Sequence, residues 1–243
     1  MQTPTWELPS GSVRLGPSER MEDMLQSTVH LVRHGEVFNP DRVLYGRLPG
    51  FHLSELGYRM ADRLSEHFAD RKEAGARIAT VAASPLLRAQ ETARPTAEAL
   101  GLTLLEEPRV IEAKNHFEGL SHIKKELGRP NHWPYLVNPF RPSWGEAYKA
   151  QVKRVVEAVK IHRDLAVKLE GNGAEAIIVA HQLPIWVTRL SAEKKPLWHD
   201  PRQRECSLAS ITSLHFDGEN LVNVEYSEPC GDLLKDASNL PGA

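Results

Sequence analysis

Short apolar runs and longer amphipathic stretches alternate along the chain. Four runs predict strands, at residues 28–32, 78–83, 102–105 and 176–180. Apolar residues at helical spacing predict helices in the intervening segments: after Ser54, from Pro85 to about Leu100, from Glu146 to Glu170, and after Pro184. A closing hairpin is predicted from two further runs joined by Asp217-Gly218: 208–216 and 221–226.

This alternation of strands and helices predicts an α/β fold. We expect three layers, α/β/α, with a mainly parallel central sheet, in one domain that spans residues 28–227. Residues 113–144 interrupt the alternation with several prolines and aromatic residues. We expect them to form an irregular insertion, or cap, over the carboxyl ends of the strands. The flanking segments, 1–27 and 228–243, lack periodicity and are interpreted as flexible arms.

Composition narrows the classes of function. The 243 residues carry a formal net charge of −2 without a block of like charges, so a nucleic-acid-binding arm is not expected. No apolar run approaches the roughly 20 residues that span a membrane. The two cysteines, Cys206 and Cys230, cannot form a disulfide framework, which favours a reducing, cytoplasmic location.

Side chains suited to phosphate chemistry follow three of the predicted strands. The first strand leads into Arg33-His34-Gly35. The second leads toward Arg88, and the fourth leads into His181. In open parallel sheets, ligands bind beyond the carboxyl ends of the strands. We therefore expect two histidines and two arginines to converge at one edge of the sheet.

This group suits a phosphate monoester, which is a dianion near neutral pH. Two guanidinium groups can bind its oxygens through charge-assisted hydrogen bonds, each contributing roughly 1.5–3 kcal/mol. A neutral imidazole nitrogen of His34 can attack phosphorus, and the second imidazole would be protonated beside the anion. Gly35 would let the backbone approach the phosphate closely. The N-terminus of the helix near Pro85 would add backbone N–H donors.

Each of these residues also fits a structural role when it is considered alone. A single histidine after a strand is commonly a structural residue, and Arg88 alone fits the surface of a helix. Arg-His-Gly is a short motif that also arises by chance. The phosphate hypothesis therefore depends on the combination of these residues at matching strand ends.

Four features occur in order along the chain: LVRHGE, SPLLRAQETA, Glu112 and VAHQLPI. Together they resemble the histidine phosphatase superfamily, which has the phosphoglycerate mutase-like fold. The resemblance extends from about Thr28 to Tyr226. It implies the same fold and a phosphatase or mutase that forms a phosphohistidine.

The resemblance also implies a role for each matching residue. His34 matches the nucleophile that becomes phosphohistidine, and Arg33 and Arg88 match the two phosphate-binding arginines. His181 matches the second histidine of the pocket. Glu112 matches the acid that protonates the leaving oxygen and then activates water, a proton transfer that typically contributes ~10²–10⁴-fold. Without the resemblance, a solvated loop carboxylate would explain Glu112 equally well.

Three further positions are candidate substrate contacts. Arg47 lies in LYGRLPGFHLSELG, which resembles a loop and helix start of the family, and a surface role fits it equally well. Asn39 follows His34 by five residues, whereas the family has an asparagine one position later, so a phosphate contact requires a shifted loop. Gln182 replaces the glycine that commonly follows the second histidine, and its side chain would narrow or line the pocket.

The sequence favours hydrolysis over mutase chemistry. Glycolytic mutases carry a longer insertion after the acid, whereas this chain has EAKNHFEG and a modest insertion there. We expect a phosphomonoesterase, without metal or cofactor, that acts on a small phosphorylated substrate as a monomer or homodimer. No nucleic-acid or membrane partner is expected, and no HExxH or clustered His and Asp spacing indicates a metal site. Two alternatives stay open: a phosphoglycerate-type mutase, and a non-catalytic module that binds phosphorylated ligands.

Overall fold

A six-stranded sheet lies at the centre of the computed structural model, which describes residues 25–121 and 145–237. The strands follow one another across the sheet in the order β3-β2-β4-β1-β5-β6. Their bounds are β1 (Gln26–Arg33), β2 (Arg77–Ala83), β3 (Leu104–Glu106), β4 (Ala174–Ala180), β5 (Ile211–Asp217) and β6 (Asn220–Ser227). The first four strands are parallel, whereas β5 and β6 form an antiparallel hairpin beside β1.

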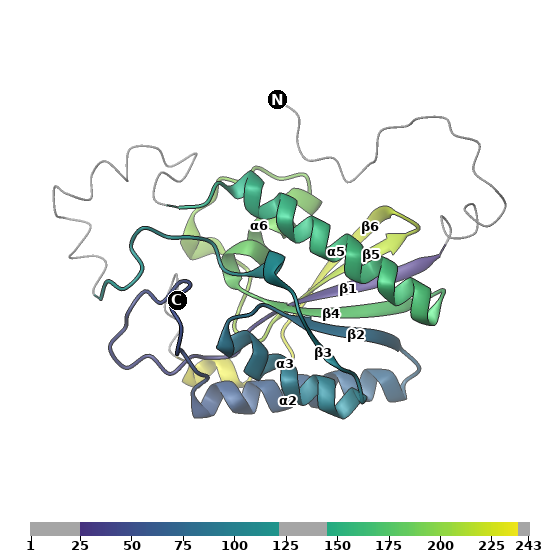
Figure 1. Cartoon of the computed structure of the whole chain (residues 1–243), viewed down its shortest axis with the longest axis horizontal. Helices are drawn as coiled ribbons and strands as arrows, with labels where there is room; N and C mark the ends of the chain where they lie inside the picture. Colours follow the sequence, from purple (N-terminus) through teal and green to yellow (C-terminus); the bar gives the residue numbers. More distant parts are fainter. Residues whose placement is uncertain (1–24, 122–144, 238–243) are drawn as a thin grey trace.

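Helices cover both faces of this sheet. Their bounds are α2 (Glu55–Glu73), α3 (Leu87–Leu100), α5 (Tyr148–Glu170) and α6 (Gln182–Ala192). Figure 1 shows α2 and α3 on one face, with α5 and α6 on the other. All seven residues of β4 are buried, because a strand in the middle of a covered parallel sheet has apolar neighbours on both sides. The predicted three-layer α/β/α fold with a mainly parallel sheet is confirmed.

Three predicted helix starts differ from the structure, among them that of α6, which begins at Gln182 rather than at Pro184. Ser54 caps α2 as predicted, accepting a hydrogen bond from the Gly57 N–H at 3.0 Å. In contrast, α3 begins at Leu87 rather than at Pro85, because Leu86 keeps an extended backbone. Helix α5 begins at Tyr148, after the predicted start at 146.

The predicted C-terminal tail packs against the domain in its described part. Residues 228–237 include the 3-10 helix η4 (Leu233–Asp236). Cys230 and Leu233 are buried in the core beside α2, and the Cys230 thiol lies 3.6 Å from the Met60 carbonyl oxygen. Because these two apolar side chains are buried in the core, residues 228–237 pack on the domain, whereas a flexible tail was predicted from residue 228. Residues 238–243 lie outside the described residues, as do residues 1–24 of the predicted N-terminal arm.

The carboxyl ends of three parallel strands meet at one edge of the sheet. The His34 N–H, just after β1, donates to the Ala180 carbonyl of β4 at 3.1 Å. The Ser84 N–H, just after β2, donates to the Val179 carbonyl at 2.9 Å. Because β5 is antiparallel to β1, with Ile211 opposite Val32, the loop that enters β5 reaches the same edge.

The described ends of the predicted insertion contact the loop that follows β1. Val43, in the loop after β1, pairs with Ser121 in an isolated bridge, and a second bridge joins Asn115 to Gly145 at the other end of the insertion. The loop after β1 leads back to α2 from the edge where β1 ends. The remainder of the insertion, residues 122–144, lies outside the described residues, so its predicted position over the strand ends stays a prediction.

A buried polar network joins β1, β4, β5 and α2. The His30 imidazole lies 2.8 Å from the Ser213 hydroxyl through Nδ1 and 3.0 Å from the Glu175 carboxylate through Nε2. Arg71 donates two hydrogen bonds of 2.7 Å to the same carboxylate. Burial raises the pKa of Glu175, but the hydrogen bonds from His30 and Arg71 outweigh it and lower that pKa to about 2. The ionised carboxylate therefore stabilises the fold.

The substitution Glu175→Gln should destabilise the protein in a pH-dependent manner. At neutral pH we expect the free energy of unfolding to fall by roughly 1.5–3 kcal/mol, the typical contribution of a hydrogen bond to a charged group. Because the folded pKa of about 2 lies below the ordinary value of 4.5, this contribution is complete above pH 4.5 and disappears as the pH falls toward 2.

Thermal unfolding at several pH values measures this effect. The difference in Tm between wild type and Glu175→Gln should shrink below pH 4.5. Glu225→Gln is the matched control, because the carboxylate of Glu225 is exposed in its pairing with His215 and exposed pairs contribute little. A difference in Tm that stays constant down to pH 2 would contradict the assignment.

Candidate active site

His34 lies immediately after β1 with only 1% of its surface exposed. Its Nδ1 lies 2.7 Å from the carbonyl oxygen of Gly35. Because a carbonyl oxygen can only accept, Nδ1 must carry the ring proton. The other nitrogen, Nε2, accepts a hydrogen bond from Arg88 Nε at 3.3 Å. The geometry therefore leaves the lone pair of His34 on Nε2.

His181 occupies the N-cap position of α6 and is fully buried. Its Nδ1 lies 3.2 Å from Arg88 Nη2, and its Nε2 lies 2.7 Å from the Ser84 hydroxyl. A guanidinium can only donate, so Nδ1 is the acceptor and Nε2 carries the proton. The rings of His34 and His181 are 5.2 Å apart between centroids. The two histidines thus converge as predicted, with opposite tautomers.

The guanidinium of Arg88 connects the two rings. Besides its bonds to both imidazoles, Nη2 donates to the Gly46 carbonyl oxygen at 2.8 Å. The guanidinium carbon lies 4.6 Å from the centroid of the Tyr45 ring, a distance suited to cation–π attraction. Arg88 is a buried helix residue with 1% of its surface exposed, so the surface interpretation of Arg88 does not apply.

Arg33, the last residue of β1, is the second buried guanidinium of the site. Its side chain donates through Nη1 to the Cys206 carbonyl oxygen at 2.7 Å, and 1% of the residue is exposed. Its charge contributes to lowering the pKa of both His34 and His181. The structure therefore brings all four predicted strand-end residues into one buried cluster.

The surroundings of both imidazoles keep them neutral. Burial, followed by the charges of Arg88 and Arg33, holds the pKa of His34 well below its ordinary value. Burial and the charge of Arg88 have the same effect on the pKa of His181. The protonated state expected for the second imidazole requires an anion beside it, since a nearby negative charge raises the pKa.

Glu112 follows the 3-10 helix η1 (Pro108–Val110) and reaches the same region. Its Oε1 accepts a hydrogen bond from the Ala113 N–H at 2.7 Å. Burial raises the pKa of Glu112, although that hydrogen bond and the charges of Arg88 and Arg204 oppose the rise. A carboxyl group with a raised pKa is suited to donate a proton.

Arg47 holds the backbone of Glu112. Its Nε donates to the Glu112 carbonyl oxygen at 2.6 Å, and its Nη2 lies 3.0 Å from the Glu146 carboxylate. Arg154 binds the same carboxylate at 2.8 Å. In this arrangement Arg47 positions the segment that carries Glu112. A direct contact between Arg47 and substrate stays a prediction.

The side chain of Asn39 stabilises its own loop. Its Nδ2 donates to the Val43 carbonyl oxygen at 2.8 Å, and its Oδ1 accepts from the Val43 N–H at 3.0 Å. Both ends of the amide are therefore engaged with the backbone of the same residue. A phosphate contact of the Asn39 side chain would need one of these bonds to break, so that contact stays a prediction.

Gly35 is required for packing, which is a reason that the sequence did not reveal. A Cβ at this position would lie 2.7 Å from the Gly57 carbonyl oxygen, so a side chain would push β1 and α2 apart. The Gly35 N–H donates to the Thr92 hydroxyl at 3.0 Å. Gly35 is thus in close contact with α2 and α3, and the expected approach of its backbone to phosphate stays a prediction.

Gln182 connects the pocket of the two histidines to a third arginine, Arg204, which the sequence did not indicate. Its Nε2 donates to the Cys206 carbonyl oxygen at 3.3 Å, the same oxygen that Arg33 binds. Its Oε1 accepts from Arg204 Nη1 at 3.4 Å. Arg204 lies before an antiparallel strand, and neither a strand end of the parallel sheet nor a family motif marks its position in the sequence.

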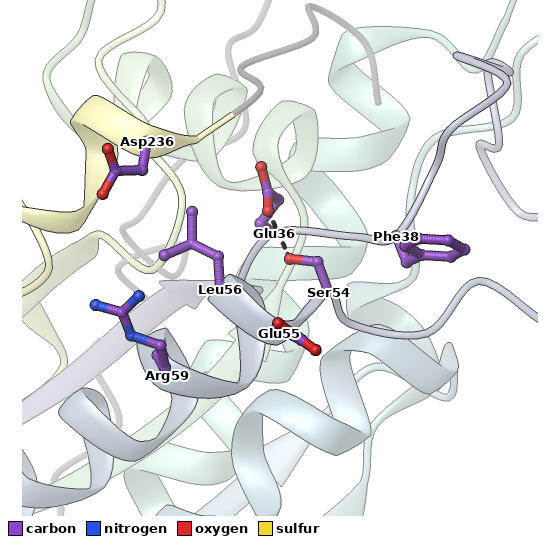
Figure 2. A pocket seen from close by; sticks show the side chains of 7 residues that line it. All are labelled: Glu36, Phe38, Ser54, Glu55, Leu56, Arg59 and Asp236. Atoms are coloured by element: carbon purple, nitrogen blue, oxygen red, sulfur yellow. Dashed lines mark hydrogen bonds between the residues drawn. The ribbon is translucent and has the colours of Figure 1, made fainter.

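An open groove lies beside this cluster rather than within it. Figure 2 shows its lining side chains, among them Glu36, Phe38 and Asp236. The Glu36 carboxylate accepts a hydrogen bond from the Ser54 hydroxyl at 2.5 Å. The four strand-end residues do not line this groove, so its shape gives no information about the imidazole chemistry.

The described residues contain neither a candidate metal site nor a candidate membrane-spanning helix. Within residues 25–121 and 145–237, no group of three or more His, Cys, Asp or Glu side chains is arranged to hold a metal ion. In those same ranges, no helix is both long enough and apolar enough to cross a bilayer.

Comparison with known proteins gives a family and a shared fold. The family model described as the histidine phosphatase superfamily (branch 1) matches residues 29–229. The uncharacterized protein Rv0525 of Mycobacterium tuberculosis is 48% identical over 207 residues, which cover 84% of this chain and 97% of that protein.

Solved structures with the same fold include enzymes of more than one activity. The mycobacterial glucosyl-3-phosphoglycerate phosphatase Rv2419c in complex with VO3 aligns with a TM-score of 0.66 and 24% identity, covering 83% of this chain and 97% of that one. A phosphoglycerate mutase from Bacillus anthracis aligns with a TM-score of 0.63 and 18% identity, covering 88% and 97%. At these identities the likeness concerns the fold alone.

The two tautomers lead to a direct spectroscopic prediction. Nitrogen-detected NMR of the histidine rings should find the proton of His34 on Nδ1 and that of His181 on Nε2. Because the pKa of each ring lies well below 6.5, both rings should stay neutral as the pH falls through 6.5 in phosphate-free buffer.

Ser84→Ala tests the assignment for one ring. This variant removes the acceptor of the His181 Nε2–H, so the signals of His181 should shift while those of His34 keep the same tautomer. Protonation of either ring at or above pH 6.5 in the wild type would contradict the assignment.

Proposed function

Because the chain belongs to the histidine phosphatase superfamily, we propose that it is a phosphomonoesterase that transfers a phosphoryl group first to His34 and then to water. The proposal is carried by one observation: the Nε2 lone pair of His34 lies beside the buried guanidinium of Arg88. A nitrogen nucleophile next to cations that can bind phosphoryl oxygens is the arrangement that this chemistry requires.

In the first proposed step, His34 Nε2 attacks phosphorus as the ester P–O bond breaks. Arg33 and Arg88 bind the phosphoryl oxygens and stabilise the charge that develops on them. His181, once the dianion has raised its pKa, adds a further positive donor. Glu112 gives its proton to the leaving oxygen, so the products are an alcohol and a phosphohistidine.

In the second proposed step, water replaces the departed alcohol. The Glu112 carboxylate takes a proton from the water as its oxygen attacks phosphorus. The P–N bond breaks, and its electron pair returns to His34 Nε2. Inorganic phosphate leaves, and Glu112 is again protonated. The proton and the lone pair return to their starting positions, so the cycle needs no further reactant.

Hydrolysis is favoured over the phosphoglycerate-type mutase by the modest insertion after Glu112. A mutase must retain the phosphoenzyme and transfer the group back to a second substrate oxygen, whereas a hydrolase needs only access for water. The proposed substrate is a small phosphate ester.

The phosphatase proposal predicts that His34→Ala abolishes turnover of an aryl phosphate. Loss of the nucleophile should lower kcat by at least about 10³-fold, because the stepwise route through the phosphohistidine is removed. Release of inorganic phosphate from p-nitrophenyl phosphate, measured with EDTA present, is the readout. The proposed chemistry uses no metal, so EDTA should leave the wild-type rate unchanged.

The same assay separates the two alternatives. Isomerisation of 3-phosphoglycerate without phosphate release would support a mutase. Tight binding of inorganic phosphate, with no turnover of any ester, would support a binding module. Arg202→Gln is the matched control for purification and folding, since the Arg202 side chain is exposed and paired with Asp200.

A second prediction concerns the pH dependence of kcat/KM. The lowered pKa of His34 keeps the nucleophile neutral below pH 6.5, so the acid limb of the profile should lie below that pH. The raised pKa of Glu112 lets it donate a proton at a pH above its ordinary value of 4.5, and activity should fall as the pH rises through that raised pKa.

Glu112→Gln tests which residue causes the alkaline limb. The variant should lose about 10²–10⁴-fold in kcat, and the alkaline limb should disappear from its profile. An alkaline limb at an unchanged position in Glu112→Gln would assign the acid to another residue. Activated esters, whose leaving groups need no proton, should lose less than alkyl phosphates.

A further inference from the structure

Arg204 reaches the site edge on the loop between α6 and β5. It follows the 3-10 helix η3 (Pro201–Gln203) and precedes the start of β5, which lies opposite the end of β1. Through Gln182 and the Cys206 carbonyl oxygen it is connected to Arg33. Burial raises the pKa of Glu112, and the charge of Arg204 is among the influences that oppose this rise.

The acceptors that orient Arg204 are neutral. Its Nε donates to His199 Nε2 at 2.9 Å, and its Nη1 donates to Gln182 Oε1 at 3.4 Å. The other nitrogen of His199 lies 2.8 Å from the Leu197 carbonyl oxygen, so it carries the proton and the ring is neutral. These contacts orient the guanidinium without balancing its charge.

The neighbouring charged residues of this loop, in contrast, are paired. Arg202 lies 2.7 Å from the Asp200 carboxylate, and Glu205 lies 2.9 Å from Arg189. Among the residues that the structure describes, no carboxylate lies within 4.0 Å of the Arg204 guanidinium. Within the same residues, Nη2 of Arg204 has no hydrogen-bond acceptor, whereas Nε and Nη1 each have one. A partly buried cation without a neighbouring anion costs free energy, and burial lowers the pKa of Arg204.

We propose that Arg204, oriented by Gln182 and His199, binds a carboxylate that the substrate carries within a few bonds of its phosphoester. This inference rests on the proposed function, since it concerns the substrate of the same site. The planar N–H donors of a guanidinium suit the oxygens of carboxylates and phosphates alike. A carboxylate is favoured over a second phosphate because its single charge balances one guanidinium, whereas a second phosphate dianion would leave excess negative charge.

Two compounds of matched shape test the proposal. 3-Phosphoglycerate carries a carboxylate where glycerol 3-phosphate carries a hydroxymethyl group. Wild type should show a kcat/KM at least about tenfold higher for phosphate release from 3-phosphoglycerate, the effect of one charge-assisted hydrogen-bonded pair. Arg204→Gln should lose at least about tenfold on 3-phosphoglycerate and less than about threefold on glycerol 3-phosphate.

Control variants separate recognition from a general effect on the site. Arg202→Gln should retain the preference of the wild type for 3-phosphoglycerate, because Arg202 is exposed and paired with Asp200. Arg204→Lys should recover part of that preference, since the charge remains but the planar donor pair does not. If Arg204 acted through Glu112 instead, Arg204→Gln would lower kcat equally on both compounds and shift the pH profile, which would overturn the proposal.

Binding measurements distinguish failure of this inference from failure of the proposed function. Calorimetry of Glu112→Gln, which binds without rapid turnover, should give a Kd at least about tenfold lower for 3-phosphoglycerate than for glycerol 3-phosphate, and the added substitution Arg204→Gln should remove the difference. Equal Kd values in Glu112→Gln would overturn the carboxylate site even if both esters are hydrolysed by the wild type. A clear difference in Kd without hydrolysis by the wild type would retain the carboxylate site and reject the phosphatase.

Discussion

The site depends on the guanidinium of Arg88, which lies between two imidazoles. Because it can only donate, its bonds to His34 Nε2 and His181 Nδ1 require both rings to be neutral, with their protons on the opposite nitrogens. The Gly46 carbonyl oxygen and the Tyr45 ring hold the guanidinium in turn. Burial then acts in the same direction, since it lowers the pKa of both histidines. One cation in a buried position thus fixes the tautomer of the proposed nucleophile.

The part of the site that the sequence could predict is the part that depends on strand ends. Strands of a parallel sheet end at one edge, so the apolar runs before His34 and His181 were sufficient to bring these residues together. Arg88 could be placed because the loop after β2 is short and leads directly into α3. The resemblance to the superfamily then added Glu112, whose position after η1 has no periodic signal of its own.

The remaining contacts depend on residues far apart in the chain, which explains why the pattern did not reveal them. Gly35 is needed because the Gly57 backbone approaches it, and Arg47 is engaged because Glu112 and Glu146 both lie within its reach. Such partners are defined only once the helices have packed on the sheet. The loop that enters β5 reaches the site because β5 is antiparallel to β1 and therefore begins at the edge where β1 ends. An apolar run does not show the direction of its strand, so this loop could not be placed from the pattern.

The balance of charge at this edge connects the fold to the proposed chemistry. Arg33 and Arg88 are almost completely buried, and the nearby carboxyl group of Glu112 has a raised pKa, so it balances less positive charge than an ionised carboxylate would. A concentration of positive charge in a low dielectric destabilises the folded chain and keeps the histidines unprotonated. A phosphate dianion bound as proposed would remove both effects, because it would offset the guanidinium charges and raise the pKa of the second imidazole. Under the proposed function, binding of the anion would therefore stabilise the protein and would at the same time make His181 a proton-bearing cation while His34 retains its lone pair for phosphorus.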